Sequence, residues 1–405
     1  MHEESFSKGE LSMHAREAMQ QALVCARSVE GRTSPRPPVG AVIVRDGEIV
    51  STGATAPPYG PHAEVQALAQ AGAAARGADL YVTLEPCCIH VHTPPCTDAI
   101  QAAGVRRVVI GTLDPNPRVR MKGVELLRRA GLEVTLLDES EAHEAAALVT
   151  PFATYITQGR PYVIAKWAMT LDGKMATVTG DARWISGPDA RTWVHEVRDR
   201  VDAIVIGAGT ARRDNPQLTV RLSPQEHHYT RTPRTTPPVR VILATHGDLS
   251  MHLQLLQPAL AAGTWVIVGE TCTSEQRERL AAAGVEVVPV AVTDGGQVDV
   301  SAALRALAQR GLMHILLEGG AMLLGSAFDQ RCIDHVAAFV APKLIGGREA
   351  PVPIGGAGLS IMSQARRLLN TRMTTLGEDV LLEGDVIYNE EPTNDIQERS
   401  EREEQ

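Results

Sequence analysis

The first half of the chain alternates between helical and extended hydrophobic patterns. Apolar residues from Ala15 to Ala26 recur at helical spacing after Ser12, a residue type that caps helices. Short apolar runs bounded by turn residues predict strands, and Asp46-Gly47 between two such runs predicts a hairpin. The expected strands are 41–44, 48–52, 80–84, 107–111 and 132–137, and further helices are expected from Val65, over 94–103 and over 124–130.

From residue 162 onward strands and helices alternate, which predicts a mostly parallel sheet with helices on both faces. The strands are expected at 162–168, 203–206, 239–244, 265–269, 285–290 and 315–317, and helices at 189–199, 274–283, 302–310 and 321–328.

Three segments have a different character. The charged, Ala-rich stretch 138–147 predicts a connecting helix between the halves, with the boundary near Gly159. Residues 221–238, rich in Thr, Pro and His, predict a long solvated loop. Residues 389–405 are dense in Glu and lack apolar periodicity, so we expect a disordered tail.

Composition narrows the classes of function. A chain of 405 residues suits two domains, and 44% hydrophobic with 21% charged residues is ordinary for a globular protein. The net charge of −9 argues against a nucleic-acid binder. We expect no membrane span, because no run of about 18 apolar residues occurs, and no signal peptide. Six cysteines do not make a disulfide framework here, which favours the cytoplasm.

The residues that carry chemistry are concentrated between 62 and 96. His62, Cys87 and Cys96 can hold Zn²⁺ with three protein ligands and leave a fourth position for water. Glu64 is placed to relay protons without binding the metal, and the whole pattern matches that of zinc deaminases. A structural zinc site is the alternative, but it usually has four protein ligands and no use for Glu64.

Other potential ligands crowd the same stretch. We interpret Cys88 as a packed thiol beside the metal site, and His90 and His92 as lining the substrate entrance. A Gly-Gly pair at Gly319-Gly320, after a predicted strand and before a helix, is typical of a diphosphate site, because glycine lets the backbone approach and the helix start offers free N–H groups. A tight strand-to-helix turn is the alternative.

Eight residues separate Cys87 from Cys96, where commoner zinc deaminases have two, and Pro94-Pro95 precedes Cys96. This insertion resembles the deaminase half of the bifunctional deaminase/reductases of riboflavin biosynthesis. The second half resembles the reductase of the same family, in matching order and spacing. The matching segments are Lys166, Thr170-Leu171-Asp172-Gly173-Lys174, Gly180, Trp184-Ile185-Ser186, Arg198, Gly209-Thr210, Asp214-Asn215-Pro216, Leu218-Thr219, Arg221, Glu318-Gly319-Gly320 and Pro342–Gly347.

The resemblance implies an α/β protein with two catalytic domains. Residues 1–150 would form a cytidine deaminase-like three-layer sandwich, 160–388 a dihydrofolate reductase-like α/β domain, and 389–405 a disordered acidic tail. The implied activities are zinc-dependent hydrolytic deamination of a phosphorylated diamino-ribosylaminopyrimidinone, and then NADPH-dependent reduction of its ribosyl group to ribityl. The expected cofactors are one Zn²⁺ per chain and NADPH, and the partner is a small phosphorylated pyrimidine, with a homo-oligomer as an open alternative.

The resemblance also implies roles for individual residues. Those expected to face NADPH are Met169, Trp184, Thr210, Asp214, Gly320, Ala321, Met322, Leu323, Leu324, Gly325 and Ser326. Those expected to face the substrate are Ala182, Arg198, Leu218, Arg221 and Glu318. Arg198 and Arg221 make chemical sense as a clamp for a ribose 5-phosphate. Lys166 and Asp214 are the candidates for a proton donor in this half.

Besides Ile89, Val91 and His92 in the metal stretch, three positions depart from the family pattern. Arg36 stands where the family has Asn, Thr55 where it commonly has His, and Ala182 where it often has Ser. We expect Arg36 to contact the polar edge or the phosphate of the substrate. Two rival functions follow: a deaminase of another nucleoside or base, and a reductase with an inactive, zinc-stabilised deaminase-like half, which Arg36 keeps open.

Overall fold

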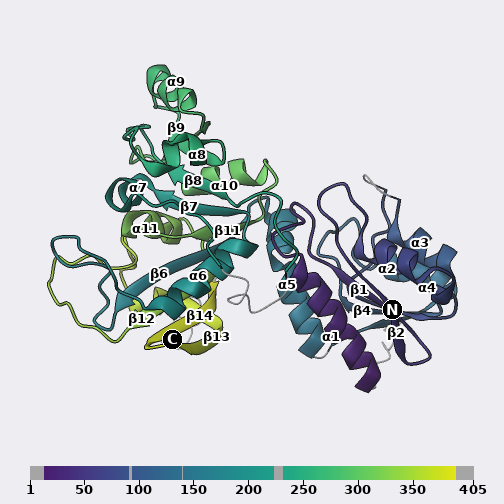
Figure 1. Ribbon diagram of the computed structural model, residues 1–405. Coiled ribbons are helices and arrows are strands. Elements are labelled where there is room, and N and C mark those ends of the chain that lie inside the picture. Colours follow the sequence, from purple (N-terminus) through teal and green to yellow (C-terminus); the bar gives the residue numbers. More distant parts are fainter. Residues whose placement is uncertain (1–12, 91–93, 139, 223–230, 389–405) are drawn as a thin grey trace, which may run out of the picture.

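The computed structural model describes residues 13–90, 94–138, 140–222 and 231–388. Within these residues the strands form two separate sheets, one of five strands and one of nine. Figure 1 shows the two sheets in two bodies, with the helix α5 (Ser140–Gln158) beside their junction. His92 and the predicted acidic tail lie outside the described residues.

The first sheet has the order β2-β1-β3-β4-β5. β1 pairs antiparallel with β2 and with β3, and β4 and β5 continue from β3 in parallel. Its strands are β1 (Gly40–Arg45), β2 (Glu48–Ala54), β3 (Asp79–Leu84), β4 (Arg107–Thr112) and β5 (Glu133–Leu136). The helices are α1 (Met13–Ser28), α2 (Ala63–Ala71), α3 (Cys96–Ala103), α4 (Lys122–Arg129) and α5, with the short 3₁₀ helix η1 (Gly72–Ala75).

Strand periodicity divides the core of this body into two layers. Ile43 and Leu80 point to one face, where they pack with residues of α2, α3 and α4. Val42 and Tyr81, their chain neighbours, point to the other face and pack with Met19 of α1 and with α5. The result is a helix–sheet–helix sandwich, as expected for this half.

The second sheet has the order β10-β9-β8-β7-β11-β6-β12-β14-β13. Strands from β10 to β12 run parallel, and β14 and β13 add an antiparallel edge. The strands are β6 (Tyr162–Thr170), β7 (Ala203–Gly207), β8 (Val239–Leu243), β9 (Thr264–Gly269), β10 (Glu286–Val290), β11 (His314–Leu317), β12 (His335–Ala341), β13 (Arg367–Leu376) and β14 (Asp379–Ile387).

Helices cover both faces of this sheet, and each face has its own buried cluster. α6 packs over one face, and α10 and α11 pack over the other. The helices are α6 (Pro188–Arg200), α7 (Ala208–Asp214), α8 (Pro258–Ala261), α9 (Ser274–Ala282), α10 (Val300–Ala308) and α11 (Ala321–Asp329), with the 3₁₀ turns η3 (Gln254–Leu256) and η4 (Met362–Gln364). No helix in the described ranges is long and apolar enough to cross a bilayer.

The structure corrects three expectations. The connecting helix does not end at 147 but runs to Gln158, because Val149 and Phe152 continue its buried face. The loop 221–238 is not wholly solvated, since the side chain of Arg231 is only 6% exposed. The predicted series of strands and helices also did not include α7 and the strands β12, β13 and β14.

Candidate active sites

The three predicted zinc ligands converge at the ends of three elements of the first body. His62 precedes α2, Cys96 is the first residue of α3, and Cys87 follows β3. His62 Nδ1 lies 3.2 Å from Cys96 Sγ and 3.6 Å from Cys87 Sγ. Ligand atoms on a tetrahedral zinc ion are about 3.3–3.8 Å apart, given zinc–ligand bonds of about 2.0–2.3 Å. The three ligand atoms all lie within 4.8 Å of one another, so the residues present fit a zinc ion with only small adjustments.

The electrostatics of this cluster favour a cation. Hydrogen bonding with Cys96 and His62 lowers the pKa of Cys87 to about 4, while the hydrogen bond with Cys87 and burial raise the pKa of Cys96, so Cys87 carries the negative charge of the pair. The backbone N–H of Cys96 also donates to Cys87 Sγ at 3.3 Å. Among the described residues, only His62, Cys87 and Cys96 form a His/Cys/Asp/Glu group close enough to hold a metal ion. Cys88 is partly buried outside this group, and His90 is exposed.

Glu64 lies in the first turn of α2, two residues after His62, and is 3% exposed. Burial, together with the negative charge of Cys87, raises the pKa of Glu64 to about 7. A carboxyl group with this environment can both hold and release a proton near neutral pH. It lies beside the cluster and outside the ligand set, and its role as a proton relay stays a prediction.

Glu85 supports the metal site through hydrogen bonds to the backbone, a role that was not predicted from the sequence. Its two carboxylate oxygens accept the backbone N–H groups of four residues between β4 and the first turn of α4: Asp114, Met121, Gly123 and Val124. The backbone passes so closely here that a Cβ on Gly123 would lie 2.3 Å from the carbonyl oxygen of Pro86. Glu85 therefore fixes the segment that carries Cys87.

A cavity of about 350 Å³ opens beside the cluster. His62, Glu64 and Cys87 form its base, and Phe152 and Tyr155 of α5 form part of its wall. The sequence missed these two aromatic residues, because an apolar residue on a helix is usually core. Asp114 also lines the cavity, and burial raises its pKa to about 6.

Arg36 and Thr55, two of the departures from the family pattern, both form hydrogen bonds within the protein. Arg36 Nη1 donates to the carbonyl oxygen of Gly60 at 2.8 Å, and Nη2 donates to those of Ala56 and Pro57. The hydroxyl of Thr55 accepts the backbone N–H of Val39 at 3.0 Å. Both side chains line the cavity. Arg36 therefore organises the loop that leads to His62, and a contact with the substrate stays a prediction.

A second cavity, of about 560 Å³, lies in the other body at the ends of β6, β7 and β11. It is lined by half of the residues predicted to face NADPH or the substrate, and also by Lys166. The predicted residues are Ala182, Trp184, Arg198, Thr210, Asp214, Leu218, Arg221 and Glu318. Met169 and Gly320–Ser326 are not among its lining residues.

The glycine turn before α11 is nevertheless joined to this cavity. Thr210 Oγ1 accepts the backbone N–H of Gly320 at 3.0 Å. Gly325 packs so closely on the loop after β12 that a Cβ there would lie 2.3 Å from the carbonyl carbon of Gly355. The start of α11 thus borders the cavity through Thr210, in keeping with a nucleotide that extends from the cavity onto the helix.

Arg198 and Glu318 form a buried ion pair at the base of this cavity. Arg198 Nε and Nη2 donate to the two Glu318 oxygens at 2.6 and 2.8 Å, and Nη1 donates to the carbonyl oxygen of Thr219 at 3.0 Å. Burial opposes the charge of Glu318, but the charge and hydrogen bonds of Arg198 outweigh it and lower its pKa. The guanidinium of Arg198, which is predicted to bind the phosphate of the substrate, therefore already forms an ion pair with Glu318.

The pKa values of two further basic residues in this cavity are lowered, which favours their neutral forms. Burial lowers the pKa of Lys166, although Glu318 opposes the shift. Burial and the charges of Arg198 and Arg221 lower the pKa of His195 to about 4. His195 Nδ1 accepts the backbone N–H of Arg221 at 3.2 Å, which leaves Nε2 to carry the hydrogen of the neutral ring. The sequence did not single out His195.

Comparison with known proteins decides the family. Residues 12–112 match the cytidine and deoxycytidylate deaminase zinc-binding region, and residues 161–382 match the RibD C-terminal domain. Over 365 residues the chain is 40% identical to the riboflavin biosynthesis protein RibD of Aquifex aeolicus, covering 90% of this chain and 96% of that protein. The chain belongs to the RibD family.

Solved structures agree over 92% of the chain. The RibD of Acinetobacter baumannii superimposes with a TM-score of 0.78 at 33% identity, covering 92% of this chain and 99% of that one. A diaminohydroxyphosphoribosylaminopyrimidine deaminase/5-amino-6-(5-phosphoribosylamino)uracil reductase from Thermotoga maritima gives 0.74 at 36% identity, covering 92% and 98%. Like other RibD proteins, this chain is a bifunctional deaminase and reductase of riboflavin biosynthesis, with a zinc-binding deaminase domain.

Proposed function

We propose that the first body deaminates a diamino-ribosylaminopyrimidinone 5′-phosphate, and that the second reduces the ribosyl group of the product with NADPH. The observation that carries the first step is the convergence of His62, Cys87 and Cys96 beside the buried Glu64. The observation that carries the second is a separate cavity lined by Lys166 and the Arg198–Glu318 pair. We assign residues up to Gln158 to the deaminase domain and 160–388 to the reductase domain.

In the deaminase cavity, His62, Cys87 and Cys96 would hold the metal, and zinc bound there would make water a stronger nucleophile near neutral pH. Glu64 takes a proton from the attacking water and delivers it to the ring nitrogen of the pyrimidine. It then carries the proton of the newly added hydroxyl group to the amino group, which leaves as ammonia while the carbonyl group forms. The aromatic wall of Phe152 and Tyr155 keeps the heterocycle against this carboxyl group.

In the reductase cavity, NADPH would supply the hydride, and the protein supplies position and charge. Thr210, Asp214 and Trp184 would hold the nicotinamide end, and the backbone N–H groups of Ala321 and Met322 at the start of α11 would receive the diphosphate. Leu323 and Leu324, predicted with them, are buried in the core below this turn. Arg198, held by Glu318, and Arg221 receive the phosphate of the substrate at the other end. Lys166, buried beside Glu318, is the candidate that protonates the ring oxygen as ribose opens to ribitol.

The rival with an inactive deaminase half finds no support. This alternative was based on Arg36. Arg36, however, donates hydrogen bonds to carbonyl groups of the loop, and the three zinc ligands still lie together beside Glu64. The test is to supply the zinc-loaded protein with the diaminopyrimidine and NADPH and to measure both ammonia and NADPH oxidation. Release of ammonia followed by NADPH oxidation is expected. NADPH oxidation only with deaminated substrate would establish the rival.

A further inference from the structure

The last turn of α6 faces two sites at once. Arg198 points into the reductase cavity, where it binds Glu318. Asp199, the next residue, is 5% exposed and points toward the first body. A carboxylate in the last turn of a helix is unfavourable, because the C-terminal end of the helix dipole is already negative. Asp199 therefore needs cations from elsewhere to be stable there.

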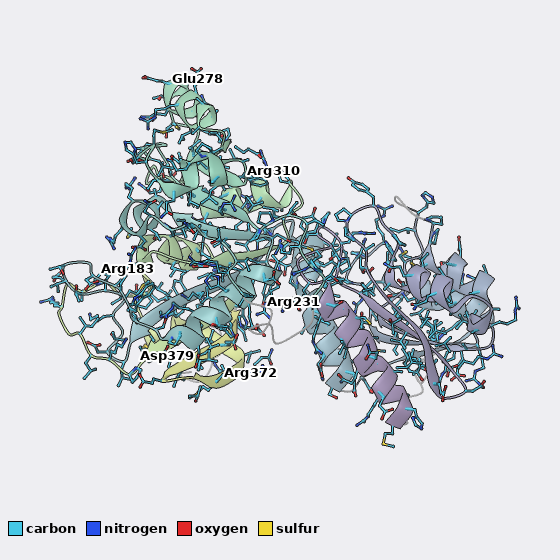
Figure 2. All side chains as sticks on the ribbon, viewed as in Figure 1. Arg183, Arg231, Glu278, Arg310, Arg372 and Asp379 are labelled. Atoms are coloured by element: carbon cyan, nitrogen blue, oxygen red, sulfur yellow. The ribbon has the colours of Figure 1, made fainter. Side chains whose placement is uncertain are left out.

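Arginines from outside α6 supply these cations, and one comes from the deaminase domain. Arg32 Nη2 donates to the Asp199 carboxylate at 2.8 Å, and its Nη1 donates to the Asp199 carbonyl oxygen at 2.6 Å. The side chains of Arg32 and Asp199 are only 6% and 8% exposed. Arg231 Nη1 reaches the same carboxylate at 3.3 Å, and Figure 2 shows Arg231 at the junction of the two bodies.

Arg231 and a third arginine, Arg234, also bind carbonyl groups at the end of the helix. The last carbonyl groups of a helix have no partner within it. Arg231 donates to the carbonyl oxygen of Glu196 at 3.3 Å, and Arg234 donates to those of Asp199 and Val201 at 2.7 and 2.9 Å. Three arginines thus cap the turn that carries Arg198, and we call Arg32, Arg231 and Arg234 the arginine clamp.

The clamp is also tied into the deaminase body. Arg32 Nε donates to the carbonyl oxygen of Thr232 at 2.8 Å, and the backbone N–H of Thr232 donates to the carbonyl oxygen of Ser28 at 2.8 Å. Nearby, Ser34 donates to Asp202 at 2.6 Å. The fit is tight, since a Cβ on Gly31 would lie 2.6 Å from the carbonyl oxygen of Arg200. The end of α6 is thus fixed from the deaminase side.

We propose that Arg32 of the deaminase domain is a positioning residue for the reductase, which holds the last turn of α6 so that Arg198 is correctly placed for the substrate. The kinetic part of this inference rests on the proposed reductase function. Removal of Arg32 leaves the buried Asp199 carboxylate with fewer cations and releases the helix end. The substrate site then loses affinity, while α11 packs on the other face of the sheet and keeps its place beside the diphosphate of NADPH.

The test uses the full-length, zinc-loaded protein and its variants Arg32→Ala, Arg32→Lys and Arg107→Ala. Arg107 is the matched control, because it pairs with Asp79 within the deaminase domain at 2.7 Å. Arg32→Ala should raise the KM for the deaminated pyrimidine about tenfold, and leave kcat and the KM for NADPH within about twofold. Arg32→Lys keeps a cation at the helix end and should stay within about threefold of wild type.

Amide hydrogen exchange of residues 196–202 gives a second readout that needs no substrate. Arg32→Ala should exchange faster there than wild type, and Arg107→Ala should not. An unchanged KM and unchanged exchange, or an equal change in Arg107→Ala, would overturn the proposal. If wild type fails to reduce the pyrimidine, the proposed function fails, and exchange alone then decides whether Arg32 holds α6.

Discussion

Replacement of Arg36 tests how the loop before the metal ligand His62 is held. The guanidinium donates to the carbonyl oxygens of Ala56, Pro57 and Gly60, the residues that lead directly to Pro61-His62. Without these bonds the loop must be ordered again each time the metal binds. We therefore expect substitution of Arg36 to weaken zinc binding more than substrate binding.

The size of the effect follows from the contacts. A hydrogen bond from a charged donor contributes about 1.5–3 kcal/mol where water is excluded. Pro57 is exposed and Arg36 only partly buried, so water can replace much of what is lost. We take the loss of the three bonds together as about 2 kcal/mol, within the range of one such bond. If all of it opposes zinc binding, affinity falls about 30-fold.

The assay is competition for zinc with a chelator, in wild type, Arg36→Ala, Arg36→Lys and Arg45→Ala. Arg45 is the control, since it is an exposed arginine of the same domain beside Asp46. Arg36→Ala should bind zinc about 30-fold more weakly, and Arg36→Lys should lie between it and wild type. At saturating zinc, the KM for the diaminopyrimidine should change less than about threefold.

The opposite pattern would refute this reasoning. If Arg36→Ala binds zinc as tightly as wild type and its KM rises by about tenfold or more, Arg36 acts on the substrate. The interpretation drawn from the sequence alone would then be right, and the loop contacts would be incidental.

Three further predictions concern single residues. Cys96→Ser should lose most of its zinc by metal analysis while Cys88→Ser keeps it, and retention by Cys96→Ser would refute the ligand set. Glu318→Gln leaves Arg198 and Lys166 buried without their carboxylate, so we expect a loss of about 3–5 kcal/mol in the free energy of unfolding and weaker substrate binding; unchanged denaturation and KM would contradict this. The pKa of His195 is about 4 in the fold and ordinarily 6.5, so the unfolded chain binds more protons between these values and stability falls as pH drops through them. His195→Gln should flatten that decline in urea midpoints measured from pH 7 to 4, and an unaltered pH dependence would count against the assignment.

The metal site could be predicted from sequence because its chemistry is local and specific. His62, Cys87 and Cys96 lie at the ends of helices and strands with a clear hydrophobic pattern. Most ways of packing these elements bring the three residues together. The reductase cavity came from the resemblance instead, since Arg198 and Glu318 are 120 residues apart and no pattern predicts that they bind each other.

The features that could not be predicted from the sequence depend on contacts with residues distant in the chain. Phe152 and Tyr155 have the spacing of a core helix, and only the packing of α5 places them in the deaminase cavity. Arg231 lies in a stretch whose composition indicates a solvated loop, yet it is buried against Asp199. β12 begins with His335 and contains several alanines, which favour helix, but it gains a parallel partner in β6.

The account claims two separate sites, and Glu64→Gln in the full-length protein tests that claim most directly. Zinc content should stay at wild-type level, because Glu64 is not a ligand. Ammonia release should fall by about 10²–10⁴-fold or more, since one carboxyl group serves several proton transfers. The same variant, given the deaminated pyrimidine and NADPH, should oxidise NADPH at close to the wild-type rate. Loss of that second activity together with the first would contradict the two-site account.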